Sequence, residues 1–176
     1  PMRKIITIIL ITLLAVFFIP RLVSVAYGQT NDNDKNSAIQ VEAADPSASP
    51  SAEFYGKAIG SVTPGILFYV DAGGNPGDIS LSLTITNTDE LVHHLRYLTL
   101  QVSVYIEDGD GQWVKPQIDG EELRDTYLTL LNSPVNFILP GLARYRVTID
   151  SGCFYCLSAS HDGENFAPRF YLDASP

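Results

Sequence analysis

Ile79-Ser80-Leu81-Ser82-Leu83-Thr84-Ile85 alternates apolar and hydroxyl side chains over seven residues. This period of two places the apolar side chains on one face of a β-strand and the hydroxyls on the other. The alternation returns over 98–106 and 144–149, and turn residues lie between these runs at Gly73–Gly77, Asp108–Gly111 and Pro140–Gly141. Many short strands separated by turns predict an all-β fold, either a sandwich or a barrel.

The N-terminal segment differs in composition from the rest of the chain. Arg3 and Lys4 precede an apolar run from Ile5 to Ile19, and small residues follow around Ala26. A basic region, an apolar region and a small-residue exit together indicate a secretory signal. We therefore expect residues 1–28 to be a signal peptide or, if uncleaved, an N-terminal membrane anchor, and the rest of the chain to be extracellular, either secreted or at the cell surface.

The next segment, residues 29–52, is rich in Asn, Asp, Ala, Ser and Pro. Such a composition buries too little apolar surface to offset the entropy of ordering. We expect a disordered linker over 29–52 and one β-sandwich domain over 53–176. The first strand of that domain is expected at Phe54–Val62.

A short helix is predicted near 120–131. Asp119 is a candidate cap with Glu122 three residues later, and Leu123, Tyr127 and Leu130 then share one helical face. Residues 126–131 are also compatible with a strand. A single helical turn is a further candidate at 89–93.

The stretch Leu139–Val147 (LPGLARYRV) carries a resemblance. Tyr145 after the Pro-Gly turn is similar to the tyrosine corner of immunoglobulin-like sandwiches. Pro76-Gly77-Asp78 before an alternating strand resembles immunoglobulin-like modules of bacterial and archaeal surface proteins, including the TasA/camelysin class of matrix-fibre proteins. The resemblance implies an immunoglobulin-like sandwich in which Tyr145 has a structural role.

Cys153 and Cys156 are the only cysteines. In an oxidising compartment a local disulfide is the preferred interpretation. Residues i and i+3 of a regular strand point to opposite faces, so the bridge would need a turn or bulge. Free thiols, or a zinc site in which His161 and either His93 or His94 join the two cysteines, remain alternatives.

Asp108 and Asp110 are candidate calcium ligands in a Gly-rich turn, although the EF-hand spacing is incomplete and Asp-Gly pairs are common in hairpins. Neither G-x-S-x-G nor H-E-x-x-H occurs in the sequence. We therefore predict a protein that is not an enzyme and has no cofactor. A secreted enzyme or metal-binding protein is the second alternative.

The charge and the aromatic residues indicate the kind of partner. The formal net charge is −9, and all 20 acidic residues follow Gly28, which argues against nucleic acid. Tyr97 and Tyr105 are predicted on the face opposite Leu98–Ile106 and are the candidate binding surface. The sequence thus favours an envelope interaction or structural module that binds an envelope protein or itself, using this face and the Phe54–Val62 strand. A carbohydrate-binding module, with polysaccharide as its ligand, is the first alternative.

Overall fold

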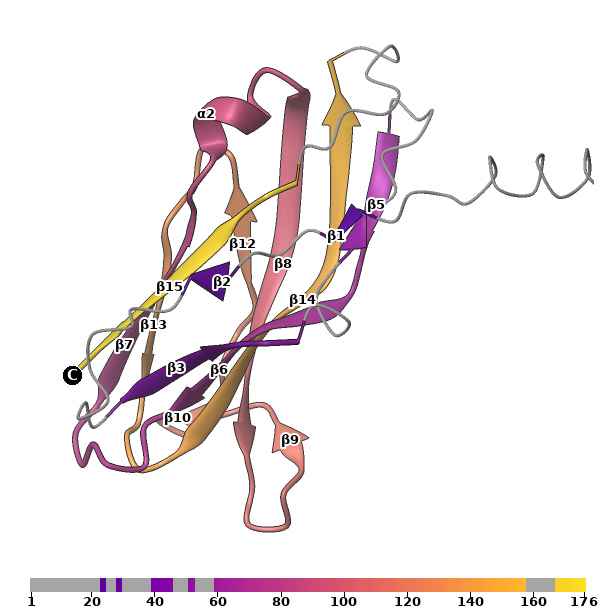
Figure 1. Ribbon diagram of the computed structural model, residues 1–176. Helices are drawn as coiled ribbons and strands as arrows, with labels where there is room; N and C mark the ends of the chain where they lie inside the picture. The colour runs from indigo at the N-terminus through magenta and orange to yellow at the C-terminus, as the bar shows by residue number, and fades with distance from the viewer. Residues whose placement is uncertain (1–22, 25–27, 30–38, 46–50, 53–58, 158–166) are drawn as a thin grey trace, which may run out of the picture.

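The computed structural model describes residues 23–24, 28–29, 39–45, 51–52, 59–157 and 167–176. Within these ranges the chain is mostly β-strand in antiparallel sheets, with one short helix, α2 (Thr88–Leu91) (Figure 1). The all-β prediction is confirmed at this level. No helix among these residues is long and apolar enough to cross a membrane.

The larger sheet is built around β14 (Arg144–Cys156), which pairs antiparallel with β8 (Leu95–Glu107). On its other side, β14 pairs with β6 (Gly65–Asp71) and then with β5 (Ile59–Thr63). Short strands extend the sheet on both sides: β3 (Gln40–Ala43) on β6, β4 (Ser51–Ala52) on β5, β1 (Val23–Ser24) on β4, and β12 (Thr126–Thr129) and β9 (Trp113–Val114) on β8.

The smaller sheet has the order β13 (Val135–Leu139), β7 (Ile79–Ile85), β15 (Phe170–Ser175) and β2 (Gly28–Gln29). Its pairs are antiparallel except that of β2 with β15, which is parallel. A separate hairpin joins β10 (Gln117–Ile118) to β11 (Glu121–Glu122). β13 ends the smaller sheet, since its only pairing among the described residues is with β7.

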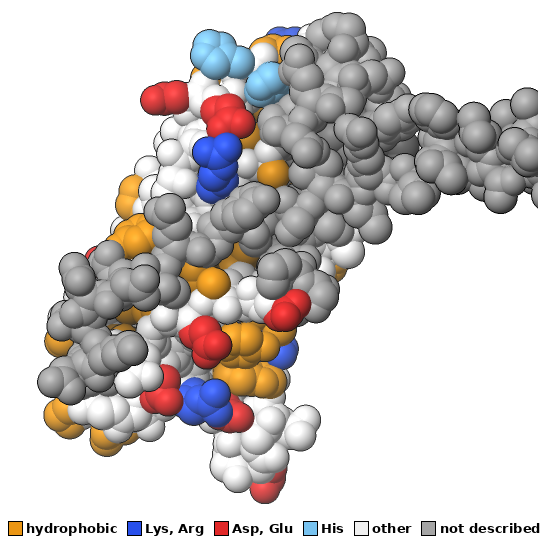
Figure 2. Space-filling model, in the orientation of Figure 1, with side chains coloured by type: hydrophobic (Ala, Val, Ile, Leu, Met, Phe, Trp, Pro, Cys, Tyr) orange, Lys and Arg blue, Asp and Glu red, His pale blue; other side chains and the backbone are white. Residues whose placement is uncertain are grey.

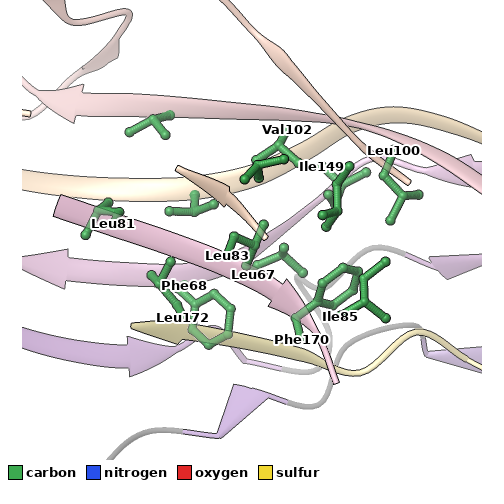
Figure 3. Packing of buried hydrophobic residues seen from close by; sticks show 14 of the residues in the cluster. Leu67, Phe68, Leu81, Leu83, Ile85, Leu100, Val102, Ile149, Phe170 and Leu172 are labelled. Atoms are coloured by element: carbon green, nitrogen blue, oxygen red, sulfur yellow. The ribbon is translucent and has the colours of Figure 1, made fainter. Parts of the chain in front are cut away.

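The two sheets share one hydrophobic core. The apolar residues of the alternating β7 run are all buried, and their neighbours in the core come from both sheets. Figure 3 shows side chains of β7 and β15 gathered with those of β6, β8 and β14: Leu81, Leu83, Ile85, Phe170, Leu172, Leu67, Phe68, Leu100, Val102 and Ile149. Burying one such side chain stabilises the fold by about 1.5–3 kcal/mol relative to leaving it exposed.

Tyr145 ties the turn before β14 to the core. Its ring is fully buried, and its hydroxyl donates a hydrogen bond to the carbonyl oxygen of Pro140 at 2.5 Å. This bond holds the turn against the start of β14. The turn itself packs backbone against backbone, because a Cβ on Gly141 would lie 2.0 Å from the carbonyl oxygen of Asn75.

The linker prediction over 29–52 is wrong at residues 39–44. Residues 40–43 form β3, which pairs with β6, and Ile39 and Ala44 are buried beside it. Gln40 and Glu42 are exposed, whereas Val41 and Ala43 are half-buried. Burial therefore alternates along this short strand as well. It belongs to the folded domain.

The helix predicted near 120–131 is also wrong. The chain there forms β11 and β12, with Asp119 and Gly120 at φ values of 54° and 83° in the preceding turn. Pairing of β12 with β8 overrides the weak helical period of these residues. The helical turn expected at 89–93 overlaps α2.

The expected N-terminal strand is only partly described. Residues 53–58 lie outside the described ranges, and β5 is flanked by both β14 and β4. β5 is therefore not an open edge of the sheet. Of the predicted signal or anchor over 1–28, only residues 23–24 and 28 fall within the described ranges.

Candidate functional site

The outward face of the larger sheet carries a cluster of aromatic and basic side chains. The guanidinium carbon of Arg146 lies 4.8 Å from the ring centre of Tyr105 and 5.2 Å from that of Trp113. The Lys115 amine lies 4.6 Å from the Tyr105 ring centre, and the ring centres of Tyr69 and Trp113 are 5.9 Å apart. Cation–π contacts of this kind stabilise by about 0.5–2 kcal/mol each.

Asp125 fixes the chain that crosses this face. Its carboxylate forms an ion pair with Lys115 and accepts hydrogen bonds from Ser103 and Gln101, both at 2.7 Å. Burial acts to raise the pKa of the Asp125 carboxyl. The hydrogen bonds from Lys115, Ser103 and Gln101 outweigh burial and lower that pKa below its ordinary value. The charged form of Asp125 therefore holds residues 115–125 against β8.

Tyr105 is part of the same layer. Its hydroxyl donates to Asp150 at 2.7 Å, and Thr148 donates to the second oxygen of Asp150 at 2.6 Å. Burial, followed by the hydrogen bond and negative charge of Asp150, raises the pKa of Tyr105 to about 12. Tyr105 is thus half-buried beneath Lys115 and Arg146, and its polar atom is engaged within the protein.

Charged side chains bridge strands at one end of this sheet. Arg144 of β14 pairs with Glu107 at 2.6 Å and with Asp71 at 3.8 Å. Figure 2 shows, near β3, hydrophobic side chains with acidic and basic side chains around them. Arg144 is half-exposed, and surface ion pairs of this kind contribute at most about 1 kcal/mol.

Tyr97 occupies a different position from Tyr105, although both belong to β8. Eight residues separate them, which corresponds to about 27 Å along a strand. Tyr97 is 49% exposed and lies directly opposite Tyr155 of β14, which is 37% exposed. With Arg96 these tyrosines line a shallow depression of about 430 Å³. The structure thus separates the two predicted binding residues and places Tyr155 beside Tyr97.

The disulfide predicted between Cys153 and Cys156 is absent from the structure. Cys153 is exposed, whereas Cys156 is buried. Both lie in β14, which shows no turn between them, so the two side chains leave opposite faces of the strand. Burial raises the pKa of the Cys156 thiol.

Asp108 acts as a turn residue. Its carboxylate accepts hydrogen bonds from the backbone N–H groups of Asp110 at 3.0 Å and Gln112 at 2.7 Å, inside the hairpin from β8 to β9. Within the described ranges, no group of three His, Cys, Asp or Glu residues is placed to hold a metal ion. His161, a candidate zinc ligand, lies outside those ranges.

The open edge of β13 borders a groove that the sequence did not predict. The groove has a volume of about 380 Å³, with residues 136–138 on one side and Ile118 and residues 121–126 on the other. Ile138 is 68% exposed at this edge, although Val135, Phe137 and Leu139 in the same strand are buried. The sequence did contain one indication of this groove: Ile138 is an apolar residue on the exposed face of the strand Val135–Leu139.

The neighbouring edge of β12 is closed differently. The side-chain amide of Asn132 donates a hydrogen bond to the carbonyl oxygen of Tyr127 at 3.1 Å, and Thr129 accepts hydrogen bonds from the backbone N–H groups of Leu131 and Asn132. Local side chains therefore satisfy part of the β12 backbone. No interaction of this kind is found for the β13 residues Asn136 and Ile138 in the part of the chain that the structure describes.

No protein-family model matches this chain, and no curated protein is similar to it at a significant level. The resemblance to immunoglobulin-like surface modules therefore stays a prediction. The geometry of the sheets and their edges is the available guide to function.

Proposed function

We propose that this chain is a non-enzymatic interaction module of the cell envelope, secreted or held at the cell surface, which binds another protein by strand addition at β13. The observation that carries this proposal is the five-residue edge Val135–Leu139, which is unpaired on one side among the described residues and exposes Ile138. An exposed sheet edge provides main-chain hydrogen bonds to an incoming strand, and adjacent side-chain pockets provide specificity.

An immunoglobulin-like sandwich is the fold we propose for the domain. Two sheets on a common core and the Tyr145–Pro140 hydrogen bond support this assignment. The N-terminal sequence pattern supports export. Such a module presents its strand edges to other envelope proteins.

A photo-crosslinking experiment at Ile138 tests the proposal. The crosslinking residue is placed at Ile138 or, as a control, at Leu142, because these side chains are 68% and 66% exposed. On intact cells we expect a discrete protein adduct from position 138 that is missing from position 142. The absence of an adduct at position 138, or the same adducts at both positions, would contradict binding through β13.

Carbohydrate binding is a second candidate, favoured by the Tyr97–Tyr155 pair. Two exposed rings on adjacent strands are a suitable surface for stacking on sugar rings. Sedimentation with insoluble polysaccharide tests it, using Tyr97→Ala and, as a control, Tyr127→Ala, since Tyr127 is 56% exposed on β12. Loss of binding in Tyr97→Ala alone would favour this candidate over strand addition.

A further inference from the structure

We infer that the groove beside β13 accepts an extended strand of a partner protein in which apolar residues alternate with Lys or Arg. This inference rests on the proposed function and specifies the chemistry of the partner. Three features of the groove support it: the direction of the β13 backbone groups, the apolar side chains within its lining, and its acidic rim.

The hydrogen bonds of β7 show which β13 groups point outward. The N–H of Ile85 donates to Ser133, on the β13 side, whereas the N–H of Thr86 donates to Arg169, on the β15 side. Backbone N–H groups alternate in direction along a strand, so the odd-numbered residues of β7 direct theirs toward β13. Their register partners in β13 are residues 135, 137 and 139.

The backbone groups of Asn136 and Ile138 consequently point toward the free edge. These residues supply two N–H donors and two C=O acceptors, spaced as an incoming strand requires. Their side chains are also the exposed ones in β13. A partner strand can therefore form a short ladder with these two residues.

The groove beside this edge has a mixed lining, in which charged and polar residues stand beside four apolar ones. Ile118 and Leu123 lie on its far side and are partly buried, and Phe137 and Ile138 lie on the β13 side. Every second side chain of an incoming strand would point the same way, so apolar residues at that spacing would contact these four side chains.

The rim of the groove is acidic. The hairpin from β10 to β11 carries Asp119, Glu121 and Glu122, all exposed, and no Lys or Arg. Arg124 is 3.8 Å from Glu121, and both side chains are more than four-fifths exposed, so their pairing is weak. Glu122 has no ion-pair partner among the described residues. Alternating Lys or Arg side chains of a partner would complement these carboxylates.

A second copy of the chain is less suited to this groove. β13 itself contains no charged residue, and a second copy would bring a second acidic hairpin toward the first. Like charges across an interface oppose association. A basic, amphipathic strand satisfies the same backbone groups and also neutralises the rim.

Peptide binding to the full chain tests this inference. The probes are two seven-residue peptides, one alternating Lys with Val and the other Glu with Val. NMR amide exchange at Asn136 and Ile138 reports on the edge. We expect the lysine peptide to slow exchange at both amides and to bind more weakly as salt rises, because the charge attraction is screened. The glutamate peptide should leave both amides unchanged.

A matched pair of variants locates the charge effect. Glu121→Gln with Glu122→Gln should weaken binding of the lysine peptide about fivefold, since two surface charge contacts are lost. Asp89→Asn with Asp110→Asn changes the net charge equally, away from the groove, and should leave binding unchanged. Equal weakening by both variants would overturn the assignment of the rim as the charge contact.

The remaining outcomes separate this inference from the proposed function. Slowed exchange with both peptides would overturn the basic preference and leave strand addition intact. If these amides exchange more slowly as the protein concentration increases, in the absence of peptide, a second copy of the chain is the occupant. That result would overturn the inference. If neither peptide slows exchange at these amides, the inference is also overturned, and crosslinking at Ile138 would then show whether β13 binds a protein at all.

Discussion

Replacing Tyr145 by Phe isolates one hydrogen bond of the core. The change keeps the buried ring and removes the hydroxyl that donates to the carbonyl oxygen of Pro140 at 2.5 Å. A typical intramolecular hydrogen bond has a net value of about 1 kcal/mol, and a buried acceptor left without a donor costs about 1–3 kcal/mol. Pro140 is an exposed residue, so water can partly replace the donor. We expect Tyr145→Phe to lower the free energy of unfolding by about 1–2 kcal/mol at pH 7.

The same variant has a pH signature. Burial, followed by the negative charge of Asp78, raises the pKa of Tyr145 to about 12, whereas an unfolded tyrosine titrates near 10. The stabilisation from the protonated hydroxyl is therefore complete below about pH 10 and is lost as the pH rises through 12. About 1.4 kcal/mol of it is lost by pH 11. Tyr145→Phe lacks this loss, so the difference between the two proteins should shrink to near zero by about pH 11.

Urea unfolding followed by the fluorescence of Trp113 measures both effects between pH 7 and 11. Tyr105, whose pKa is also raised, is present in both proteins and contributes equally to each. Equal stability of the two proteins at pH 7 would refute the structural role of the hydroxyl. A difference that stays constant up to pH 11 would refute the raised pKa.

Three further substitutions and one labelling experiment test other parts of the structure. Gly141→Ala should cost about 3 kcal/mol or more in urea unfolding, because its Cβ would meet a backbone oxygen at 2.0 Å; a small effect would show that the turn can move. Asp125→Asn should cost about 1–2 kcal/mol at pH 7 through its weakened hydrogen bonds. Because the pKa of Asp125 is lowered, its stabilisation is lost as the pH falls below about 4, so the variant should show a flatter acid limb. A maleimide should label Cys153 in the native protein but Cys156 only after unfolding, and equal labelling rates would contradict the burial of Cys156. Ile39→Ala should cost about 2–4 kcal/mol as a buried deletion, whereas an unchanged midpoint would place Ile39 outside the core.

The fold class could be predicted from the sequence because the decisive pattern is local. The clearest matches, β7 and the first half of β14, alternate apolar and polar residues over at least six positions. Strand β3 has four residues within a polar segment, so its pattern was too short to separate from a linker. Its stability comes from pairing with β6, a partner that the sequence does not reveal.

The candidate site was harder to predict because it depends on contacts between distant residues. Residues 119–131 fit a helical period, but their position is set by the Asp125 carboxylate and by the pairing of β12 with β8. The sequence pattern places Tyr97 and Tyr105 on the same face of β8. Only the structure shows that Lys115 lies over the Tyr105 ring, whereas Tyr97 is exposed to solvent. Whether a strand lies at the end of a sheet is likewise a property of topology, so the edge at β13 was not predictable.

The two edges on this flank of the molecule are treated differently. At β12 the side-chain amide of Asn132 donates a hydrogen bond to the backbone carbonyl of Tyr127. This carbonyl is then not free to accept a hydrogen bond from an added strand. At β13 the chain places no charged residue in a protein that has 20 acidic residues, and it exposes Ile138 instead. An open, uncharged edge favours aggregation unless it is short. Pro134 and Pro140 lie immediately outside β13, and neither can donate a ladder hydrogen bond, so the pairing surface stops at five residues. An edge limited in this way can add one strand in a defined register but offers little length for further stacking, which is the behaviour that a specific binding site requires.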